Sequence, residues 1–463
     1  MNEPLKHKLF SVYGQILNEK ILKEAWKRVR RNNGSGGVDK VTIEKFKENL
    51  DENIEKLLME LKEKTYKPSP VRRVYIPKKN GKMRPLGIPT IKDRIVQQAL
   101  VMRLEPFFEA NVFHRDSCGF RPNRDAETAL KKILWNIETG HHYIYDFDIK
   151  GYFDSIPHKK LMKVLNKYIA DGTVLDIIWK SLKAGYMEDD IVYETASGTM
   201  QGGVISPLIA NIYLNELDWE LEKEHLRFVR YADDSIVMCK TEQELERAKA
   251  VVHRVLNELG LELAEDKSDD IDFHDKDFDF LGFTFRHIWT DEKGEWRYFV
   301  KPSDKSLKKF KQDLKARTRK MYSHSFEEWS EELNPILRGK FNYFLVANKA
   351  VKAVWIECRK RGMGFHGKAK RSYGDLDGYV RQRLRVNFAN RGKRHAGRRD
   401  GKLMTVKYGN EFFVKTMGLV TGHYMAMQLR EPSLTVDEFL MRIKRKSKGT
   451  RDRTKFFQYA YAR

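Results

Sequence analysis

The stretch Phe228-Val-Arg-Tyr-Ala-Asp-Asp-Ser-Ile-Val-Met238 decides how the rest of the chain is interpreted. Two adjacent aspartates, Asp233 and Asp234, lie between two apolar runs of the β type, which predicts a strand, a tight turn and a second strand. Adjacent carboxylates repel each other and are commonly tolerated where solvent or a cation neutralises them. This stretch alone favours a surface turn and a catalytic turn about equally, because Asp is a common turn former.

A second carboxylate changes that balance. Asp148 ends another apolar strand, Tyr143-Ile-Tyr-Asp-Phe-Asp148. This position is expected if the two strands are neighbours in a sheet and their carboxylates lie close together. Three converging carboxylates bind two Mg²⁺ ions well, and a metal pair about 4 Å apart stabilises both the attacking 3′-oxygen and the leaving pyrophosphate. The pattern therefore indicates nucleotidyl transfer.

Outward from this centre, strands and helices alternate in an α+β arrangement. The chain before Leu61 has helical spacing, interrupted by the loop 32–39, and Thr42 offers an N-cap for the helix that follows. Residues 77–81 form the expected hairpin turn after a strand at 71–76. Helical patterns are expected at 93–108, 126–137, 159–183, 206–225 and 242–259, and again, in a basic segment, beyond about Lys301.

The charge of the chain is unevenly distributed. The 463 residues carry a formal net charge of +23, made up of +11 in residues 1–100, −13 in 101–300 and +25 in 301–463. Three solvated domains of differing pI would explain this. An acidic, metal-holding centre between basic regions that neutralise a phosphate backbone explains it as well. Charge alone also permits ribosome or anionic-membrane binding.

Composition narrows the class of protein. No run approaches the roughly 18 apolar residues that a membrane span needs, and the first residues lack the core of a signal peptide. The three cysteines, Cys118, Cys239 and Cys358, are too far apart in sequence for a paired-cysteine zinc site or a disulfide framework. We expect a soluble protein in a reducing compartment, the bacterial cytoplasm or nucleoid, with an organelle as the other setting.

An ordered set of motifs resembles the reverse transcriptase and maturase proteins that group II introns encode. Tyr231-Ala-Asp-Asp234 follows Gln201-Gly-Gly-Val-Ile-Ser-Pro-Leu208, and Asp148-Ile-Lys-Gly-Tyr-Phe-Asp154 resembles the first catalytic motif of this family. Gly81-Lys-Met-Arg-Pro-Leu-Gly-Ile-Pro89 and Ser117-Cys-Gly-Phe-Arg-Pro-Asn123 resemble its earlier blocks, and Leu333-Asn-Pro-Ile-Leu-Arg338 its thumb.

The resemblance implies a right-hand polymerase, with fingers and palm built on an antiparallel sheet, then a helical thumb. The implied domains are an N-terminal extension with a template-covering loop (1–60), fingers and palm (61–300), a thumb or maturase domain (301–389) and a basic C-terminal DNA-binding region (390–463). The family's C-terminal endonuclease has no counterpart after Gly401, so second-strand cleavage is not expected.

By the same resemblance, Asp148 and Asp233 hold two Mg²⁺ ions, with Mn²⁺ as a substitute, and Asp234 supports them. Phe153 matches the aromatic ring that would clash with a 2′-hydroxyl and so favours deoxynucleotides, although an ordinary core Phe is the simpler explanation without the motif. Lys267 resembles a lysine that protonates pyrophosphate, or is a solvated lysine beside two acids. The implied dNTP-binding residues are Arg72, Lys78, Arg84, Phe153, Gln201, Gly202 and Lys267.

The glycine-rich loop ahead of the fingers matches a segment that covers the template in this family, although a plain flexible turn explains it equally well. Its implied template-binding residues are Asn33, Gly34, Ser35, Gly36 and Gly37. Two departures from the family pattern, Met200 in place of Pro and Lys40 in place of Gly, remove no ligand or charge from the proposed chemistry.

The implied function is an RNA-directed DNA polymerase that also binds its intron RNA, assists splicing and supports retrohoming by target-primed reverse transcription. Its implied partners are group II intron RNA, an RNA template with a DNA primer, target DNA and dNTPs, without a membrane. Two alternatives stay open: a related reverse transcriptase recruited to defence or DNA repair, and a splicing-only RNA-binding maturase.

Overall fold

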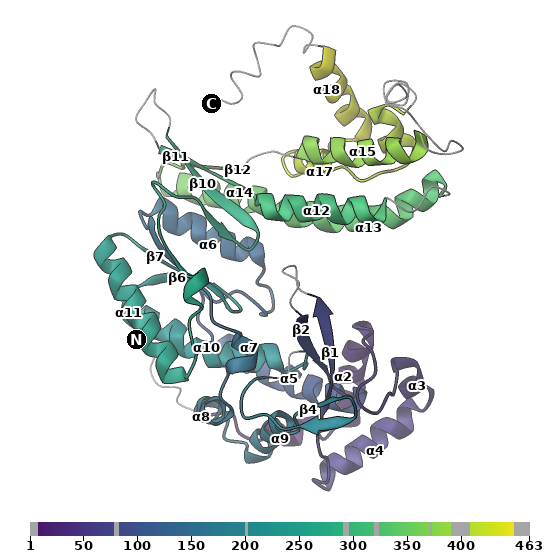
Figure 1. Ribbon diagram of the computed structural model, residues 1–463, viewed down its shortest axis with the longest axis vertical. Coiled ribbons are helices and arrows are strands. Elements are labelled where there is room, and N and C mark those ends of the chain that lie inside the picture. Colours follow the sequence, from purple (N-terminus) through teal and green to yellow (C-terminus); the bar gives the residue numbers. More distant parts are fainter. Residues whose placement is uncertain are drawn as a thin grey trace. The chain divides into compact units, whose positions relative to one another are not determined.

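The polypeptide divides into two compact units, each described here by itself (Figure 1). Met1–Asp125 with Gly140–Asp270 form the N-terminal unit, and Ala126–Thr139 with Ile271–Arg463 form the C-terminal unit. The predicted division into four domains stays a prediction. The computed structural model describes residues 8–77, 83–199, 202–289, 296–318, 324–369, 373–389 and 408–448.

Amphipathic helices open the N-terminal unit: α1 (Val12–Ile16), α2 (Glu19–Arg31), α3 (Ile43–Glu48) and α4 (Leu50–Lys62). In α2, apolar residues at three- and four-residue spacing form one buried face, namely Leu22, Ala25, Trp26 and Val29. The Thr42 hydroxyl accepts a hydrogen bond from the Lys45 amide, which confirms the predicted cap of α3. The buried helix α5 (Ile91–Asn111) packs against α1 and α2.

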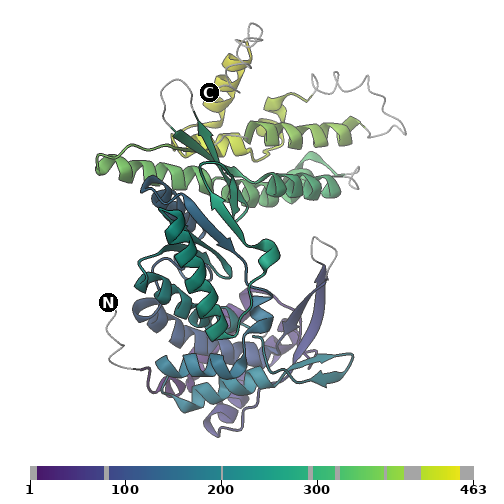
Figure 2. The same cartoon turned by 60° about the vertical axis from the view of Figure 1, so that its left-hand side comes forward.

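A four-stranded sheet in the order β2-β1-β4-β5 lies in this unit (Figures 1 and 2). β1 (Val71–Pro77) pairs antiparallel with β2 (Met83–Ile88), with Arg72 opposite Ile88. On its other side β1 runs parallel to β4 (Tyr186–Glu188), which pairs antiparallel with β5 (Ile191–Tyr193).

The second sheet carries the aspartates and has the order β6-β7-β3-β8. β7 (Asp234–Cys239) is a central strand between β6 (Arg227–Tyr231) and β3 (Tyr143–Phe147), and β8 (Asp269–Asp272) forms an edge. Five of the six β7 residues are buried, which explains its nearly continuous apolar sequence. The helices that accompany this sheet are α7 (Tyr152–Ser155), α8 (His158–Tyr168), α9 (Gly172–Lys183), α10 (Ser206–Lys223) and α11 (Glu242–Leu259).

The C-terminal unit combines helices with a sheet in the order β12-β11-β10-β9. Its strands are β9 (Phe278–Phe280), β10 (Phe283–Trp289), β11 (Trp296–Pro302) and β12 (Gly367–Ala369). Its helices are α6 (Ala126–Glu138), α12 (Asp304–Arg317), α13 (Phe326–Phe344), α14 (Val346–Lys360), α15 (Tyr373–Ala389), α17 (Gly422–Gln428) and α18 (Val436–Lys448), with a π-helical turn at Phe412–Thr416. An apolar core of Phe, Leu and Trp side chains joins α12, α13 and α15.

The predicted α+β class is confirmed as a mixed arrangement of helices and sheets. The stretch 159–183 forms two helices, because the chain turns at Asp171, whose carboxylate caps α9 by accepting from the Thr173 and Val174 amides. The predicted turn at 77–81 lies outside the described residues except for Pro77. Within the described part of the chain, no helix is both long and apolar enough to span a membrane.

Candidate active site

The hairpin β6–β7 presents the aspartate pair. Tyr231 pairs with Asp234, so the two-residue loop is Ala232-Asp233, and Asp234 is already the first residue of β7. Ala232 has φ 61°, a left-handed conformation that a residue with a Cβ rarely adopts. This turn aims two consecutive carboxylates at the same end of the sheet.

Asp148 reaches that same end from the neighbouring strand. β3 pairs antiparallel with β7, and Phe147 lies opposite Ser235. Because the strands run in opposite directions, the residue after Phe147 lies beside the residue before Ser235. The register therefore brings Asp148 next to Asp234, as the sequence predicts.

Lys267 faces Asp148. Its ammonium forms an ion pair with Asp148 Oδ2. The backbone holds both residues there, since the Ala264 amide donates to the Asp148 carbonyl over 2.8 Å and the Lys150 amide to the Glu262 carbonyl over 2.9 Å. The predicted proximity of Lys267 to the carboxylates is thus a feature of the structure, while its chemical role stays a prediction.

The electrostatics of the carboxylates reflect their crowding. Burial raises the pKa of Asp234 to about 6, and the charges of Asp233 and Asp148 add to the rise, while Lys267 opposes it. Burial also raises the pKa of Asp233, with Asp148 adding to it and Arg84 opposing it. The Asp234 side chain still reaches solvent, so ions have access to it.

The donor set suits a divalent cation. Carboxylate oxygens are preferred ligands of Mg²⁺, and a bound cation would relieve the repulsion that raises these pKa values. The described residues contain no group of three His, Cys, Asp or Glu side chains already arranged around a metal position, and the ammonium of Lys267 occupies one oxygen of Asp148. The residues that would hold the metal are Asp148, Asp233 and Asp234.

The predicted dNTP-binding residues are only partly gathered here. Arg84, on β2, is near enough to Asp233 to lower the pKa of that carboxyl. Gly202 packs on the same strand, since a Cβ built at this position would lie 2.4 Å from the Gly87 carbonyl oxygen, and its φ of 103° also favours glycine. Lys78 and Gln201 lie outside the described residues.

Arg72 makes a different contact. Its Nε and Nη2 donate to the Gly36 carbonyl oxygen over 3.1 and 2.8 Å, so it links β1 to the loop 33–37. Arg94 anchors the same loop by donating to the Ser35 carbonyl. A Cβ on Gly37 would lie 2.6 Å from the Thr90 amide nitrogen, which shows how closely this loop packs on the chain before α5. The segment from Ser35 to Gly37 is therefore anchored against β1 and the start of α5.

Phe153 is partly buried. Its ring lies 6.2 Å from the ring of Phe120 and 5.4 Å from that of Tyr152, both in edge-to-face geometry. Tyr152 is fixed in turn, because its hydroxyl donates to the Ala210 carbonyl over 2.6 Å. The ring of Phe153 is thus well supported, and its role in sugar selection stays a prediction.

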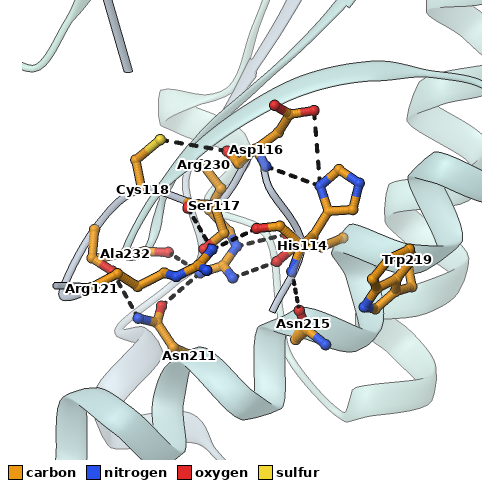
Figure 3. A network of polar contacts seen from close by, with 12 residues as sticks. His114, Asp116, Ser117, Cys118, Arg121, Asn211, Asn215, Trp219, Arg230 and Ala232 are labelled. Atoms are coloured by element: carbon orange, nitrogen blue, oxygen red, sulfur yellow. Dashed lines mark hydrogen bonds and ion pairs between the residues drawn. The ribbon is translucent and has the colours of Figure 1, made fainter. Parts of the chain in front are cut away.

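Beneath the hairpin lies a buried polar network that sequence reasoning missed (Figure 3). Arg230, on β6, is 1% exposed and pairs with Asp218 of α10, which is fully buried. The signal was present in the sequence: a charged residue interrupts the apolar run Phe228-Val-Arg-Tyr, and α10 carries polar residues at Asn211, Asn215 and Asp218, spaced by four and three.

Two segments of the chain match known protein families. Residues 76–285 match the family described as "Reverse transcriptase (RNA-dependent DNA polymerase)", and this segment holds all three aspartates. Residues 307–359 match the "Group II intron, maturase-specific domain", which takes in α13 and most of α12 and α14.

Curated relatives agree with these matches. The chain is 41% identical over 194 residues to Protein YkfC of Escherichia coli (strain K12), which covers 41% of this chain and 51% of that protein. It is also 41% identical over 257 residues to the group II intron-encoded protein LtrA of Lactococcus lactis subsp. cremoris, covering 55% of this chain and 42% of LtrA. The chain thus spans about half the length of the curated relatives it matches.

Among solved structures, a chain of the "Partial Cas6-RT-Cas1--Cas2 complex" aligns with 55% of this chain and 45% of its own length at a TM-score of 0.35 and 21% identity, which is too weak to add to the sequence matches.

Over residues 76–285 the chain is thus similar to reverse transcriptases, and the three aspartates of the site lie within this match. The maturase-specific match and the identity with LtrA narrow this similarity to the reverse transcriptase and maturase proteins that group II introns encode.

Proposed function

We propose that this protein is an RNA-directed DNA polymerase that extends a DNA primer on an RNA template with dNTPs. The observation that carries the proposal is the meeting of Asp148 with Asp233 and Asp234 at one end of the β6-β7-β3-β8 sheet. The raised pKa of Asp234 adds to it, because like charges held together without a local counter-charge for each indicate a site built for a cation.

The proposal gives each residue of the site one role. Asp148 and Asp233 would hold two Mg²⁺ ions, for which Mn²⁺ would substitute, and Asp234 would support them. Bound there, the ions would offset the negative charge of the attacking 3′-oxygen and of the leaving pyrophosphate. Lys267 forms an ion pair with Asp148, and in this proposal its ammonium gives a proton to the departing pyrophosphate.

Residues around the carboxylates orient the nucleotide in this proposal. Arg84 faces the negative charge of the triphosphate, together with Lys78 and Arg72, and Gly202 with Gln201 lines the approach of the base and sugar. Phe153 excludes a 2′-hydroxyl, and the loop 33–37 covers the template. The anchoring of Ser35 to Gly37 by Arg94 and Arg72 supports a cover of defined shape.

The architecture we propose is a right-hand polymerase: an N-terminal extension (1–60), fingers and palm (61–300), a thumb or maturase domain (301–389) and a basic C-terminal region that contacts target DNA (390–463). The reverse transcriptase match across 76–285 and the maturase match across 307–359 support the middle two.

A primer-extension assay tests the polymerase function. The full chain should extend a DNA primer on an RNA template with dNTPs and Mg²⁺, stop when EDTA removes the metal and resume when Mg²⁺ is restored. Asp148→Asn should lower the rate by about 1,000-fold or more, since it removes a metal ligand. A wild-type chain that leaves the primer unextended at every Mg²⁺ or Mn²⁺ concentration contradicts the proposal.

The second proposed function is binding of the parent group II intron RNA, which assists splicing and allows retrohoming by target-primed reverse transcription in the bacterial cytoplasm or nucleoid, or in an organelle. The maturase-specific match supports it. So does a groove of about 440 Å³ in the C-terminal unit, lined by Asp304, Leu307, Lys308, Lys311, Gln312, Lys315 and Tyr379. Three lysines beside an aromatic ring suit a nucleic-acid backbone.

The groove predicts a salt-dependent affinity for intron RNA. The double variant Lys311→Ala with Lys315→Ala should weaken binding about tenfold at moderate salt and reduce the slope of log affinity against log salt by about 1.5, because two phosphate contacts are lost. The matched control is Lys159→Ala with Lys163→Ala, two exposed lysines at the same spacing on α8. Equal slopes for both double variants contradict the groove as the binding site.

Two alternatives give different results in the same assays. A splicing-only maturase would bind intron RNA without extending a primer, whereas the three intact aspartates favour polymerisation. A reverse transcriptase recruited to defence or DNA repair would extend primers without preferring intron RNA, and its gene would lie outside any intron. Sequencing the RNA that co-purifies with the protein separates these cases.

A further inference from the structure

Helix α10 buries a stripe of polar side chains that the proposed catalysis does not use. Asn211, Asn215 and Asp218 are spaced by four and three residues and are at most 2% exposed. Burial of polar groups is unfavourable unless each finds a partner, and burial of a charge more so. The partners of this stripe therefore show what it is for.

Asp218 holds the guanidinium of Arg230. Arg230 Nε donates to Asp218 Oδ1 over 2.7 Å, and Nη2 to Oδ2 over 2.5 Å, a two-point pairing between side chains that are each 1% exposed. This geometry fixes the plane of the guanidinium. The remaining nitrogen, Nη1, is thereby aimed in one direction.

Nη1 of Arg230 points at the catalytic turn. It donates to Asn211 Oδ1 over 2.9 Å and to the carbonyl oxygen of Ala232 over 3.0 Å (Figure 3). Ala232 is the left-handed residue of the turn and directly precedes Asp233. An alanine held at a positive φ needs surroundings that prevent its relaxation, and such strain is concentrated at functional sites.

The loop before Arg121 closes on the turn from another side. The Cys118 amide donates to the Arg230 carbonyl over 2.7 Å, and the Asn211 amide group donates to the Gly119 carbonyl over 2.8 Å. A Cβ on Gly119 would lie 2.3 Å from the Ala232 nitrogen and 2.7 Å from the Tyr231 carbonyl carbon, so only glycine fits. Gly119 thus packs directly on the peptide between Tyr231 and Ala232, one residue before Asp233.

We infer that Gly119, Asn211, Asp218 and Arg230 form a brace that holds Ala232 in its left-handed conformation and so positions Asp233 and Asp234 for metal. The four are positioning residues, since none of them touches the reacting atoms. The inference rests on the proposed polymerase function for its catalytic consequence. Its structural content, the link between the brace and metal binding by the turn, can be measured without catalysis.

Two variants break the brace in different ways. Arg230→Lys keeps a positive charge beside Asp218 but has no fork to reach the Ala232 carbonyl. Gly119→Ala leaves the ion pair of Arg230 and Asp218 intact, but its added Cβ would collide with the Tyr231–Ala232 peptide. It therefore still tests the brace if Arg230→Lys does not fold. The matched control is Tyr13→Phe, because it removes another buried hydrogen bond of the same unit, the one that the Tyr13 hydroxyl of α1 donates to the Leu61 carbonyl of α4 over 2.5 Å.

Three measurements on the full chain test the brace: binding of Mn²⁺ alone followed by electron paramagnetic resonance, amide hydrogen exchange of the segment 228–239, and steady-state primer extension. In Arg230→Lys and Gly119→Ala, we expect Mn²⁺ affinity to fall about tenfold, as for other residues that support metal ligands. Exchange should accelerate at 231–234 more than elsewhere in the N-terminal unit. The kcat should fall about 100-fold with the KM for dNTP within about threefold, because misplaced groups slow the chemical step.

The outcomes separate the two hypotheses. If the wild-type chain does not extend primers, the proposed function fails, while Mn²⁺ affinity and exchange still report on the brace. If both variants bind Mn²⁺ as tightly as the wild type and exchange at 231–234 is unchanged, the brace is wrong. An equal loss in Tyr13→Phe also overturns it, because the effect would then be a general loosening of the unit.

Discussion

Two hairpins in the N-terminal unit carry adjacent aspartates, and they are built differently. In β4–β5, Asp189 and Asp190 form the loop itself, with φ of 50° and 61°, and both are exposed. In β6–β7 the pair is shifted by one residue, so that Asp233 is in the loop and Asp234 begins the strand.

This shift decides what each pair can do. Aspartates that occupy both loop positions point into solvent, and the first hairpin is thus the surface turn that an Asp-Asp sequence suggests. In the second hairpin the one-residue shift places Asp234 in the sheet beside Asp148. Asp234 still reaches solvent, but desolvation of its carboxyl and the like charges of Asp233 and Asp148 raise its pKa. Whether an Asp-Asp pair is a candidate metal site therefore depends on the strand register of its hairpin and on the carboxylates of the neighbouring strand.

The largest expected effect is on the rate of primer extension, which should depend on the aspartates of β6–β7 but not on those of β4–β5. Asp233→Asn should reduce primer extension by about 1,000-fold or more, because it removes a ligand of the proposed metal site, whereas Asp190→Asn should stay within about twofold of the wild type. Asn tolerates the left-handed conformation of position 190, so the control preserves its turn. Both variants should show the same far-UV circular dichroism and the same yield. If the two variants extend primers at similar rates, the prediction that only the β6–β7 hairpin carries catalytic aspartates is wrong.

The sequence predicted the β6–β7 hairpin and its neighbour because the signals are local. Apolar runs on both sides of Asp233 and the strand that ends at Asp148 have the pattern of buried strands, and their convergence was expected. The exact loop, Ala232-Asp233, was not predicted, since the register depends on pairing with β3 and on the contacts beneath the turn.

The contacts beneath the turn were missed because they join distant parts of the chain. Arg230 donates a hydrogen bond to Asp218, twelve residues earlier in the sequence, and Asn211 donates one to Gly119, ninety-two residues earlier. No local pattern shows which buried charge pairs with which. For the same reason the anchoring of the loop 33–37 by Arg72 was not foreseen, although both segments were singled out.

The C-terminal unit was predicted less completely. The helical, basic character after Lys301 is confirmed by α12 to α15, whose apolar residues recur at helical spacing. The strands β9 to β12 were not predicted, because two of them have only three residues and acidic residues interrupt the apolar pattern around Phe278. Their pairing depends on contacts such as Phe278 with Phe285, whose rings stack 4.6 Å apart.

A smaller effect is expected on stability in the absence of metal. The pKa of Asp234 is raised to about 6 in the folded chain, above the ordinary value of 3.8, so the folded state binds this proton more tightly than the unfolded state does. The contribution of Asp234 to stability is therefore present below about pH 4 and is lost as the pH rises through about 6. Asp233 has the same sign, since burial raises its pKa as well.

Urea unfolding in EDTA at pH 4, 5, 6 and 7 measures this contribution. Asp234→Asn removes the titrating group and should flatten part of the decline in unfolding free energy between pH 4 and pH 6, leaving the variant more stable than the wild type at pH 7. The matched variant Asp189→Asn should retain the wild-type decline, because its side chain lies in an exposed loop.

Adding Mg²⁺ at pH 7 should stabilise the wild type and Asp189→Asn but have less effect on Asp234→Asn, since a ligand that binds only the folded state raises its stability. A lower unfolding free energy for Asp234→Asn than for the wild type at pH 7 without metal would contradict this prediction. It would mean that repulsion among Asp148, Asp233 and Asp234 does not destabilise the folded chain, so the two hairpins would not differ in their electrostatics.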